Sequence, residues 1–234
     1  MTELFILHLS DLHFGTIKDA DKWYSQLADD LKIELKCKRL DILLISGDVS
    51  NKSEPNEYAA AQTFIKNLSN EFGLTPSKII IVPGNHDVNW SFSKNCYRLD
   101  DRDNVADQLV NGNHVDLGHG AVRIKIDEEY SKRFNNFFDF YEKVTGYSYP
   151  ANDEESGIIH FMHEEGLLIL SLNSAWETDH LFTDRASICS DAIDTALNKI
   201  RSKEYYRDCL KFAVWHHPLS SSSQDRITDH GFME

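Results

Sequence analysis

Four short polar clusters stand where apolar runs of the sequence end. They contain Asp, His and Asn, whose carboxylate, imidazole and amide groups bind divalent metals such as Zn, Mn or Fe. Metal ions held by such groups promote hydrolysis of phosphate esters. A convergence of the clusters would therefore indicate a metal site for phosphate chemistry. The clusters are Asp11-Leu12-His13, Gly47-Asp48, Gly84-Asn85-His86-Asp87 and His216-His217-Pro218.

The elements that would position these clusters are strands and helices in alternation. Strand-like apolar runs at 4–9, 41–46 and 78–82 precede the first three clusters. Helical spacing of apolar residues at 20–38, and again from Tyr58 to a capping Gly73, separates these runs. This order is typical of a parallel sheet covered by helices, in which the carboxyl ends of the strands share one edge. We therefore expect the clusters to meet there.

The second half of the chain is less regular. Residues 88–126 are rich in Asn, Asp and Gly and lack a sustained periodicity, which favours a functional loop, a lid or an insertion. An aromatic stripe predicts a helix at 127–145 whose rings pack in the core. Residues 157–163 and 166–172 are expected to form a hairpin, and a helix at 190–202 to lead into a last strand at 210–215. Without internal repeats or a clear linker, residues 1–234 are interpreted as a single domain.

Composition restricts the classes of partner. The 234 residues carry a formal charge of −14, from 24 basic and 38 acidic side chains, which disfavours a broad surface for nucleic acid. A nucleotide substrate remains compatible, since bound cations can dominate the charge of a site. The sequence has neither a membrane-span pattern nor a signal-peptide pattern, so we expect a cytoplasmic protein without membrane contact. The four scattered cysteines are expected to be reduced.

The residue types suggest a role for each of the first two clusters. Asp11 and His13 are two positions apart, and on an extended segment this spacing points both side chains to the same side. Asp48 follows an apolar run, where a carboxylate requires a partner. Its two oxygens could bridge two cations, although capping a turn or the following helix is the alternative.

The last two clusters add a neutral ligand and a proton donor. The amide oxygen of Asn85 can bind a metal, which leaves His86 to face the substrate while Asp87 orients its ring. Of His216 and His217, one is expected to be a ligand; a solvated or packed histidine is the alternative.

As an ordered set, these motifs resemble the calcineurin-like metallophosphoesterase superfamily, most closely its cyclic-nucleotide-phosphodiesterase-like branch. The resemblance runs from residue 4 to residue 218. It implies an α/β fold, a β-sandwich flanked by helices in α-β-β-α layers, with a C-terminal part missing. The protein serine/threonine phosphatases carry Gly-Asp-x-Val-Asp-Arg-Gly, and the stretch from Gly47 to Lys52 fits that pattern poorly.

The resemblance implies a site with two divalent metal ions, with Mn, Fe or Zn as the expected identities. Asp48 would bridge them, and His86 would contact the phosphoryl oxygens or protonate the leaving group, with Asp87 behind it. The first histidine of His-x-Pro is the ligand in the family, which selects His216. The implied metal ligands are Asp11, His13, Asp48, Asn85 and His216.

One family motif has no counterpart. A final Gly-His-x-His supplies one histidine to each metal, and neither Gly118-His119-Gly120 nor Asp229-His230-Gly231 matches it. We therefore expect the sequence to be a piece of a longer parent chain with further C-terminal domains, and to hold the second ion weakly.

These observations predict a metal-dependent hydrolase of phosphoester bonds. The expected reaction is that of a phosphodiesterase using a hydroxide shared by two metals, on a small phosphoester or nucleotide. Two alternatives stay open. One is a metal-dependent nuclease, against which the acidic balance counts; the other is a non-catalytic nucleotide-sensing or regulatory domain of a larger protein.

Overall fold

The first sheet of the computed structural model is parallel, as the alternation of strands and helices predicts. The structure describes residues 3–110, 112–220 and 226–228. The strand order is β1-β2-β3, with Ile6 opposite Ile42 and Leu43 opposite Ile79. All three strands thus point their carboxyl ends toward the same edge. The elements are β1 (Ile6–Leu9), α1 (Ile17–Asp29), β2 (Ile42–Ser46), α2 (Pro55–Phe72) and β3 (Ile79–Val82).

The second sheet combines a hairpin with a parallel strand. Strands β7 (Ile158–Met162) and β8 (Leu167–Ser171) pair antiparallel, which confirms the predicted hairpin. Helix α6 (Ser190–Arg201) then leads to β9 (Leu210–Val214), which pairs parallel with β8. The carboxyl ends of β8 and β9 therefore also lie at one edge.

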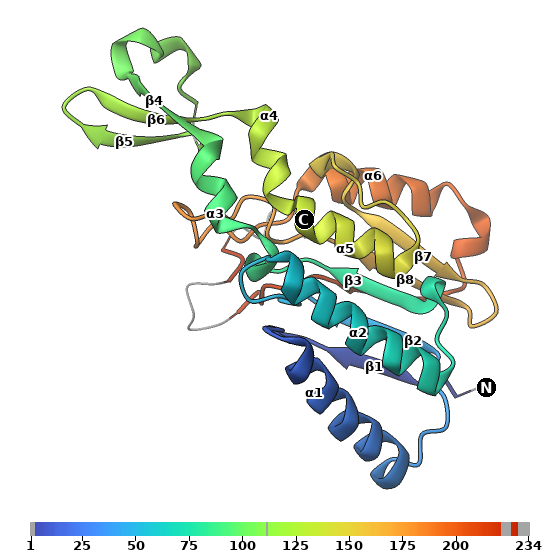
Figure 1. Ribbon diagram of the computed structural model, residues 1–234. Coiled ribbons are helices and arrows are strands. Elements are labelled where there is room, and N and C mark those ends of the chain that lie inside the picture. The colour runs from blue at the N-terminus through green and yellow to red at the C-terminus, as the bar shows by residue number, and fades with distance from the viewer. Residues whose placement is uncertain (1–2, 111, 221–225, 229–234) are drawn as a thin grey trace.

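The two sheets pack face to face, and helices cover their outer faces (Figure 1). Successive strand residues point to opposite faces, so Ile80 and Ile169 lie in a cluster between the sheets. Their neighbours point outward: Ile81 packs against residues of α1, α2 and α5 (Asn135–Thr145), and Leu170 packs against residues of α6. The expected α-β-β-α layers are confirmed.

Residues 88–110 and 112–126 contain short strands and helical turns, so the expected lack of regular structure is wrong, while a role as a lid or an insertion stays a prediction. Helix α3 (Trp90–Ser93) leads to β4 (Tyr97–Asp101), β5 (His114–Gly118) and β6 (Ala121–Lys125), an antiparallel sheet of order β4-β6-β5. This small sheet projects from the body of the molecule (Figure 1). Its own core is a small cluster of Val105, Val122 and Ile124.

The remaining helices differ from prediction mainly at their ends. Gly73 ends α2 in the left-handed conformation (φ 73°), as predicted. The helix expected at 127–145 is divided into α4 (Asp127–Tyr130), a 3-10 turn (Ser131–Phe134) and α5, and α1 continues into a π turn (Asp30–Glu34). The other 3-10 turns are Pro76–Lys78, Asn85–Asp87, Lys94–Cys96, Arg102–Asn104, Ala106–Gln108, Asp153–Glu155 and Glu204–Tyr206.

Two further observations concern the described ranges as a whole. None of their helices combines the length and the apolar character that crossing a bilayer requires. All four cysteines are free thiols.

Candidate metal centre

The polar clusters meet at the carboxyl ends of the strands. The loop after β1 runs alongside the loop after β2 and is held to it by backbone hydrogen bonds. The amide of Asp11 donates to the Gly47 carbonyl at 3.2 Å, and that of His13 donates to the Asp48 carbonyl at 2.9 Å. The backbone thereby fixes the relative positions of these three side chains before any ion binds.

The loops that carry these residues adopt a conformation that L-residues rarely take. Asp11, His13 and Asp48 have φ of 55°, 42° and 53°, in the left-handed region. The segment from Asp11 to His13 is therefore not extended, whereas the two-residue spacing had been interpreted on an extended segment. Such backbone strain costs on the order of 1–3 kcal/mol per residue and clusters at functional sites. Here it turns three potential ligands toward one point.

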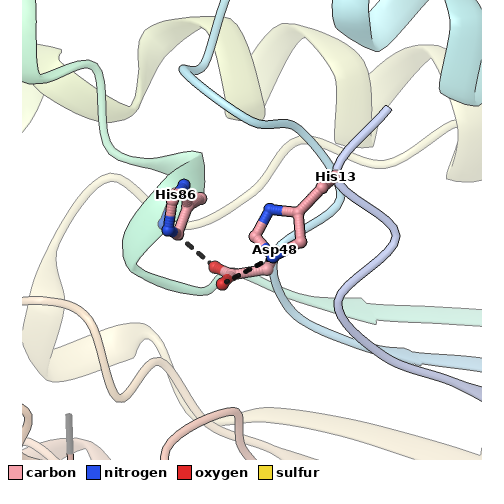
Figure 2. A group of neighbouring side chains, drawn as sticks. All are labelled: His13, Asp48 and His86. Atoms are coloured by element: carbon pink, nitrogen blue, oxygen red, sulfur yellow. Dashed lines mark hydrogen bonds and ion pairs between the residues drawn. The ribbon is translucent and has the colours of Figure 1, made fainter. Parts of the chain in front are cut away.

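The Asp48 carboxylate lies at the centre of the cluster. Its Oδ2 atom is 3.8 Å from Nε2 of His13 and 3.3 Å from Nε2 of His216. Figure 2 shows the side chains of His13 and His86 on either side of Asp48. Two groups of potential ligands result, each with its ligand atoms within 4.8 Å of one another: His13, Asp48 and His86, and Asp11, Asp48 and His216. Asp48 belongs to both.

Two glycines allow the strands to approach this closely. A Cβ atom on Gly84 would lie 2.1 Å from Oδ1 of Asp48, and one on Gly47 would lie 2.6 Å from the His216 ring. Gly47 also has φ of 94°. Any larger residue would displace a potential ligand, which gives a physical reason for glycine at the ends of β2 and β3.

The two adjacent histidines after β9 have different environments. Nδ1 of His216 donates to the Ser46 carbonyl at 2.8 Å, which directs Nε2 toward Asp48. Burial lowers the pKa of His216, but the hydrogen bond and charge of Asp48 outweigh it and raise the pKa to about 9. Burial likewise opposes ionisation of Asp48, yet the bond from His216 holds its pKa below the usual value.

His217 lies outside the donor cluster. Its ring is 1% exposed, and its Nδ1 atom lies 2.8 Å from the Ser174 hydroxyl. Burial, together with the neighbouring His216, lowers the pKa of His217 to about 4. The structure thus distinguishes the two histidines: His216 faces Asp48, as the family resemblance implies, and His217 does not.

The turn after β3 holds the three other predicted residues. The His86 amide donates to Oδ1 of Asp48 at 2.9 Å, and Nδ1 of its ring donates to the Asn51 carbonyl at 2.8 Å. The ring stands edge-on to the His13 ring, with 4.6 Å between centroids. Asn85 is 9% exposed in the same turn.

Asp87 does not orient the His86 ring, contrary to expectation. Its buried carboxylate accepts hydrogen bonds from the amides of Gly84, Val49 and Ser50 and from the hydroxyls of Ser50 and Tyr58, at 3.0–3.2 Å. Burial and the nearby charge of Asp48 raise the pKa of Asp87. Asp87 therefore ties the turn after β3 to the loop after β2, and the Asn51 carbonyl orients the ring.

Sequence reasoning missed the residue that supports the His-His pair. The Ser174 hydroxyl accepts from the amides of His216 and His217 at 3.2 and 3.1 Å. A signal for it was present, because Asn173-Ser174 follows the apolar run of β8 just as the other polar clusters follow theirs. Polar residues after that strand belong to the same edge.

The residues at this edge fit a divalent metal. Carboxylate oxygens and imidazole nitrogens are suitable ligands for Zn, Mn or Fe. Nδ1 of His13 is buried and, among the described residues, has no hydrogen-bond partner. His119, in the turn between β5 and β6, is exposed and lies outside both ligand groups. His230 lies outside the described residues.

Comparison with known proteins agrees with this geometry. The family model for calcineurin-like phosphoesterases matches residues 5–231. The chain is also 27% identical, over 236 residues, to an uncharacterised metallophosphoesterase-like protein, YydB, of Bacillus subtilis (strain 168). That match covers 96% of this chain but only 45% of YydB, so the chain spans less than half of this relative's length. The chain belongs to the calcineurin-like phosphoesterase family.

Proposed function

We propose that this site hydrolyses phosphodiesters with the help of two divalent metal ions. The observation that carries the proposal is the position of Asp48. A single buried carboxylate is shared by two groups of potential ligands. A carboxylate has two oxygens, so it can serve two ions at once, and a two-metal site suits displacement at phosphorus.

The ions would be held by Asp11, His13, Asp48, His216 and the amide oxygen of Asn85. When bound, they supply Lewis-acid polarisation of the phosphoryl group and activation of water near neutral pH. Asp11 and Asp48 together contribute two negative charges, which is fewer than two divalent cations bring. The site therefore keeps a positive balance that attracts an anionic diester.

His86 is the proposed proton donor and is therefore left out of the proposed ligand set, although its ring lies in the same group as His13 and Asp48. Because Nδ1 donates to the Asn51 carbonyl, the other ring nitrogen, Nε2, is the atom left to exchange a proton. The backbone bond from His86 to Asp48 keeps this ring beside the ligand cluster. In the protonated form, Nε2 passes its proton to the departing alkoxide oxygen. General acid catalysis of this kind contributes typically about 10²–10⁴-fold in rate.

The test compares bis(4-nitrophenyl) phosphate with 4-nitrophenyl phosphate in the presence of added Mn²⁺. We expect the diester to be cleaved faster, and chelation with EDTA to abolish the reaction. His86→Ala should lower kcat by about 10²-fold or more on a diester with an alkoxide leaving group, such as 2′,3′-cyclic AMP, while circular dichroism stays unchanged. The loss should be smaller on bis(4-nitrophenyl) phosphate, because nitrophenolate departs without a proton. Equal or faster cleavage of the monoester would overturn the diesterase assignment.

A second measurement separates metal binding from turnover. Asp48→Asn keeps the shape of the side chain but removes its charge, so titration calorimetry with Mn²⁺ should show at least tenfold weaker binding. Asp194→Asn is the matched control, because Asp194 is exposed on α6 and lies outside both ligand groups. Unchanged Mn²⁺ affinity in Asp48→Asn would remove Asp48 from the proposed site.

A further inference from the structure

A pocket of about 310 Å³ opens beside His86. It is lined by Lys52, His86, Val88 and Trp90, together with Asn51 and Ser91. A volume of this size lies at the lower end of the range for small-molecule sites. Because His86 lines the pocket and also lies within the ligand cluster, the pocket adjoins the place where a phosphate would react.

Trp90 gives this pocket an aromatic wall. Its indole lies nearly parallel to the His86 imidazole, with an interplanar angle of 27° and 6.2 Å between ring centroids. The indole N–H donates to the Asn85 carbonyl at 3.2 Å. The ring is thus anchored to the turn that carries Asn85 and His86, and it offers a preorganised surface for a planar ring.

Lys52 places a positive charge at the same pocket. Its side chain is exposed, and its ammonium group forms no ion pair within the described ranges. In a protein of net charge −14, a free cation beside the site is suited to an anionic ligand. The pocket therefore combines an apolar ring surface with a site for charge.

We propose that the substrate is a phosphoester carrying a planar aromatic group, a nucleobase or an aryl ring, which stacks on Trp90 beside His86. The proposal rests on the proposed hydrolysis, because the pocket adjoins that site and defines its substrate class. Lys52 would attract the negative charge of the phosphate, and Trp90 would stack against the aromatic ring. Stacking of a base on an aromatic side chain corresponds to about tenfold in affinity.

The test is titration calorimetry of the 234-residue chain, in the presence of Mn²⁺, with two matched pairs of ligands. Phenyl phosphate is compared with cyclohexyl phosphate, and AMP with ribose 5-phosphate. We expect the aromatic member of at least one pair to bind about tenfold more tightly. A preference confined to the phenyl pair supports an aryl ester, and one confined to AMP supports a nucleotide.

Single-residue variants test whether Trp90 causes the preference for the aromatic ligand. Trp90→Ala should abolish the difference within each pair, and Trp90→Phe should retain part of it, which also controls for folding. Lys52→Gln should weaken both members of a pair equally. Tyr205→Ala, an exposed aromatic outside the pocket, should behave as wild type.

The outcomes separate this proposal from the proposed hydrolysis. Equal affinities within both pairs, or a preference that persists in Trp90→Ala, overturn the stacking role even when the diester is cleaved. Absence of diester cleavage alongside a Trp90-dependent preference overturns the hydrolysis and leaves the aromatic site standing.

Discussion

At the scale of single residues, Asp48 and Asp87 show how neighbouring carboxylates acquire different roles. The Asp48 side chain is 5% exposed, and its oxygens face the histidines of the ligand cluster. The Asp87 oxygens are directed at backbone amides and hydroxyls. One carboxylate is thus available to bind an ion, and the other is fully used by the protein itself.

Asp87→Asn is expected to lower the stability of the fold. The substitution removes the charge and presents an NH₂ group where an oxygen accepts hydrogen bonds. Since hydrogen bonds to a charged group contribute about 1.5–3 kcal/mol each, and an unmade one costs a similar amount, we expect a loss of about 2–4 kcal/mol. Urea denaturation followed by circular dichroism measures this loss.

Tyr58→Phe provides the graded comparison for Asp87→Asn. It removes only one of the donors to Asp87 and should cost about 1 kcal/mol. If Asp87→Asn instead left the denaturation midpoint unchanged and lowered only kcat, the role of Asp87 would be in the reaction and not in the turn.

The sequence predicted that the polar clusters would meet at one edge, but it did not predict all of their contacts. Asp11, His13, Asp48 and His216 converge as expected, because the carboxyl ends of parallel strands share an edge. The partner of His86 could not be predicted. Asn51 contributes only its backbone carbonyl, and a carbonyl is present at every position of a sequence, so residue type carries no signal for it.

At the scale of elements, the site depends on the turns that follow the strands. The turns after β2 and β3 lie so close together at Gly84 that there is no room for a Cβ atom between them. Backbone bonds from the β1 loop to the β2 loop extend the parallel pairing beyond the strands, up to the bridge between Phe14 and Ser50. The parallel pairing of β1 and β2 thereby continues into the loops that hold the potential ligands.

Gly84→Ala is expected to disrupt the site through sterics alone. Its added Cβ would meet Oδ1 of Asp48 at 2.1 Å, so that the carboxylate or the turn must move. Overpacking of this kind costs about 1–3 kcal/mol, and we expect Mn²⁺ affinity to fall at least tenfold as Asp48 is displaced. Calorimetric titration and thermal melting measure the two effects.

Gly15→Ala is the matched control for this clash. A Cβ atom there would make only an ordinary contact, 3.7 Å from Asp19. Gly15 also lacks the positive φ that would strain an alanine. Wild-type affinity for Mn²⁺ in both alanine variants would show that the close approach of β2 and β3 is unimportant for the site.

The elements that sequence reasoning missed share a physical cause. The small sheet of β4, β5 and β6 buries little apolar surface, and Leu99 and Leu117 on its strands are 68% and 47% exposed. Strands β4 and β5 are largely exposed and show no alternation of buried apolar and exposed polar residues. Strand β6 does alternate, with buried Val122 and Ile124 on either side of exposed Arg123, but over only five residues. Strands β2, β3 and β8, in contrast, are apolar and almost wholly buried, and they were predicted.

At the scale of the whole molecule, packing between the strands shifts the titration of some partly buried groups. His160 on β7 is one of them. Its Nε2 atom lies 3.0 Å from the Ser171 hydroxyl on β8, and burial lowers its pKa to about 4. Because the unfolded chain binds a proton near pH 6.5 and the folded chain does not, protonation of His160 favours unfolding.

The free energy of unfolding should therefore decrease as the pH falls from about 6.5 to 4. A depressed histidine pKa gives full stability above 6.5, and the loss across the window is about 3 kcal/mol from this residue. His160→Gln keeps a partner for Ser171 but cannot be protonated, so its urea-derived stability should fall less steeply with acidification.

The exposed His163→Gln serves as the matched control and should keep the wild-type slope. Titration of other groups is common to all three proteins and cancels in the difference. Parallel pH profiles for wild type and His160→Gln would show that β7 admits a protonated histidine at no cost.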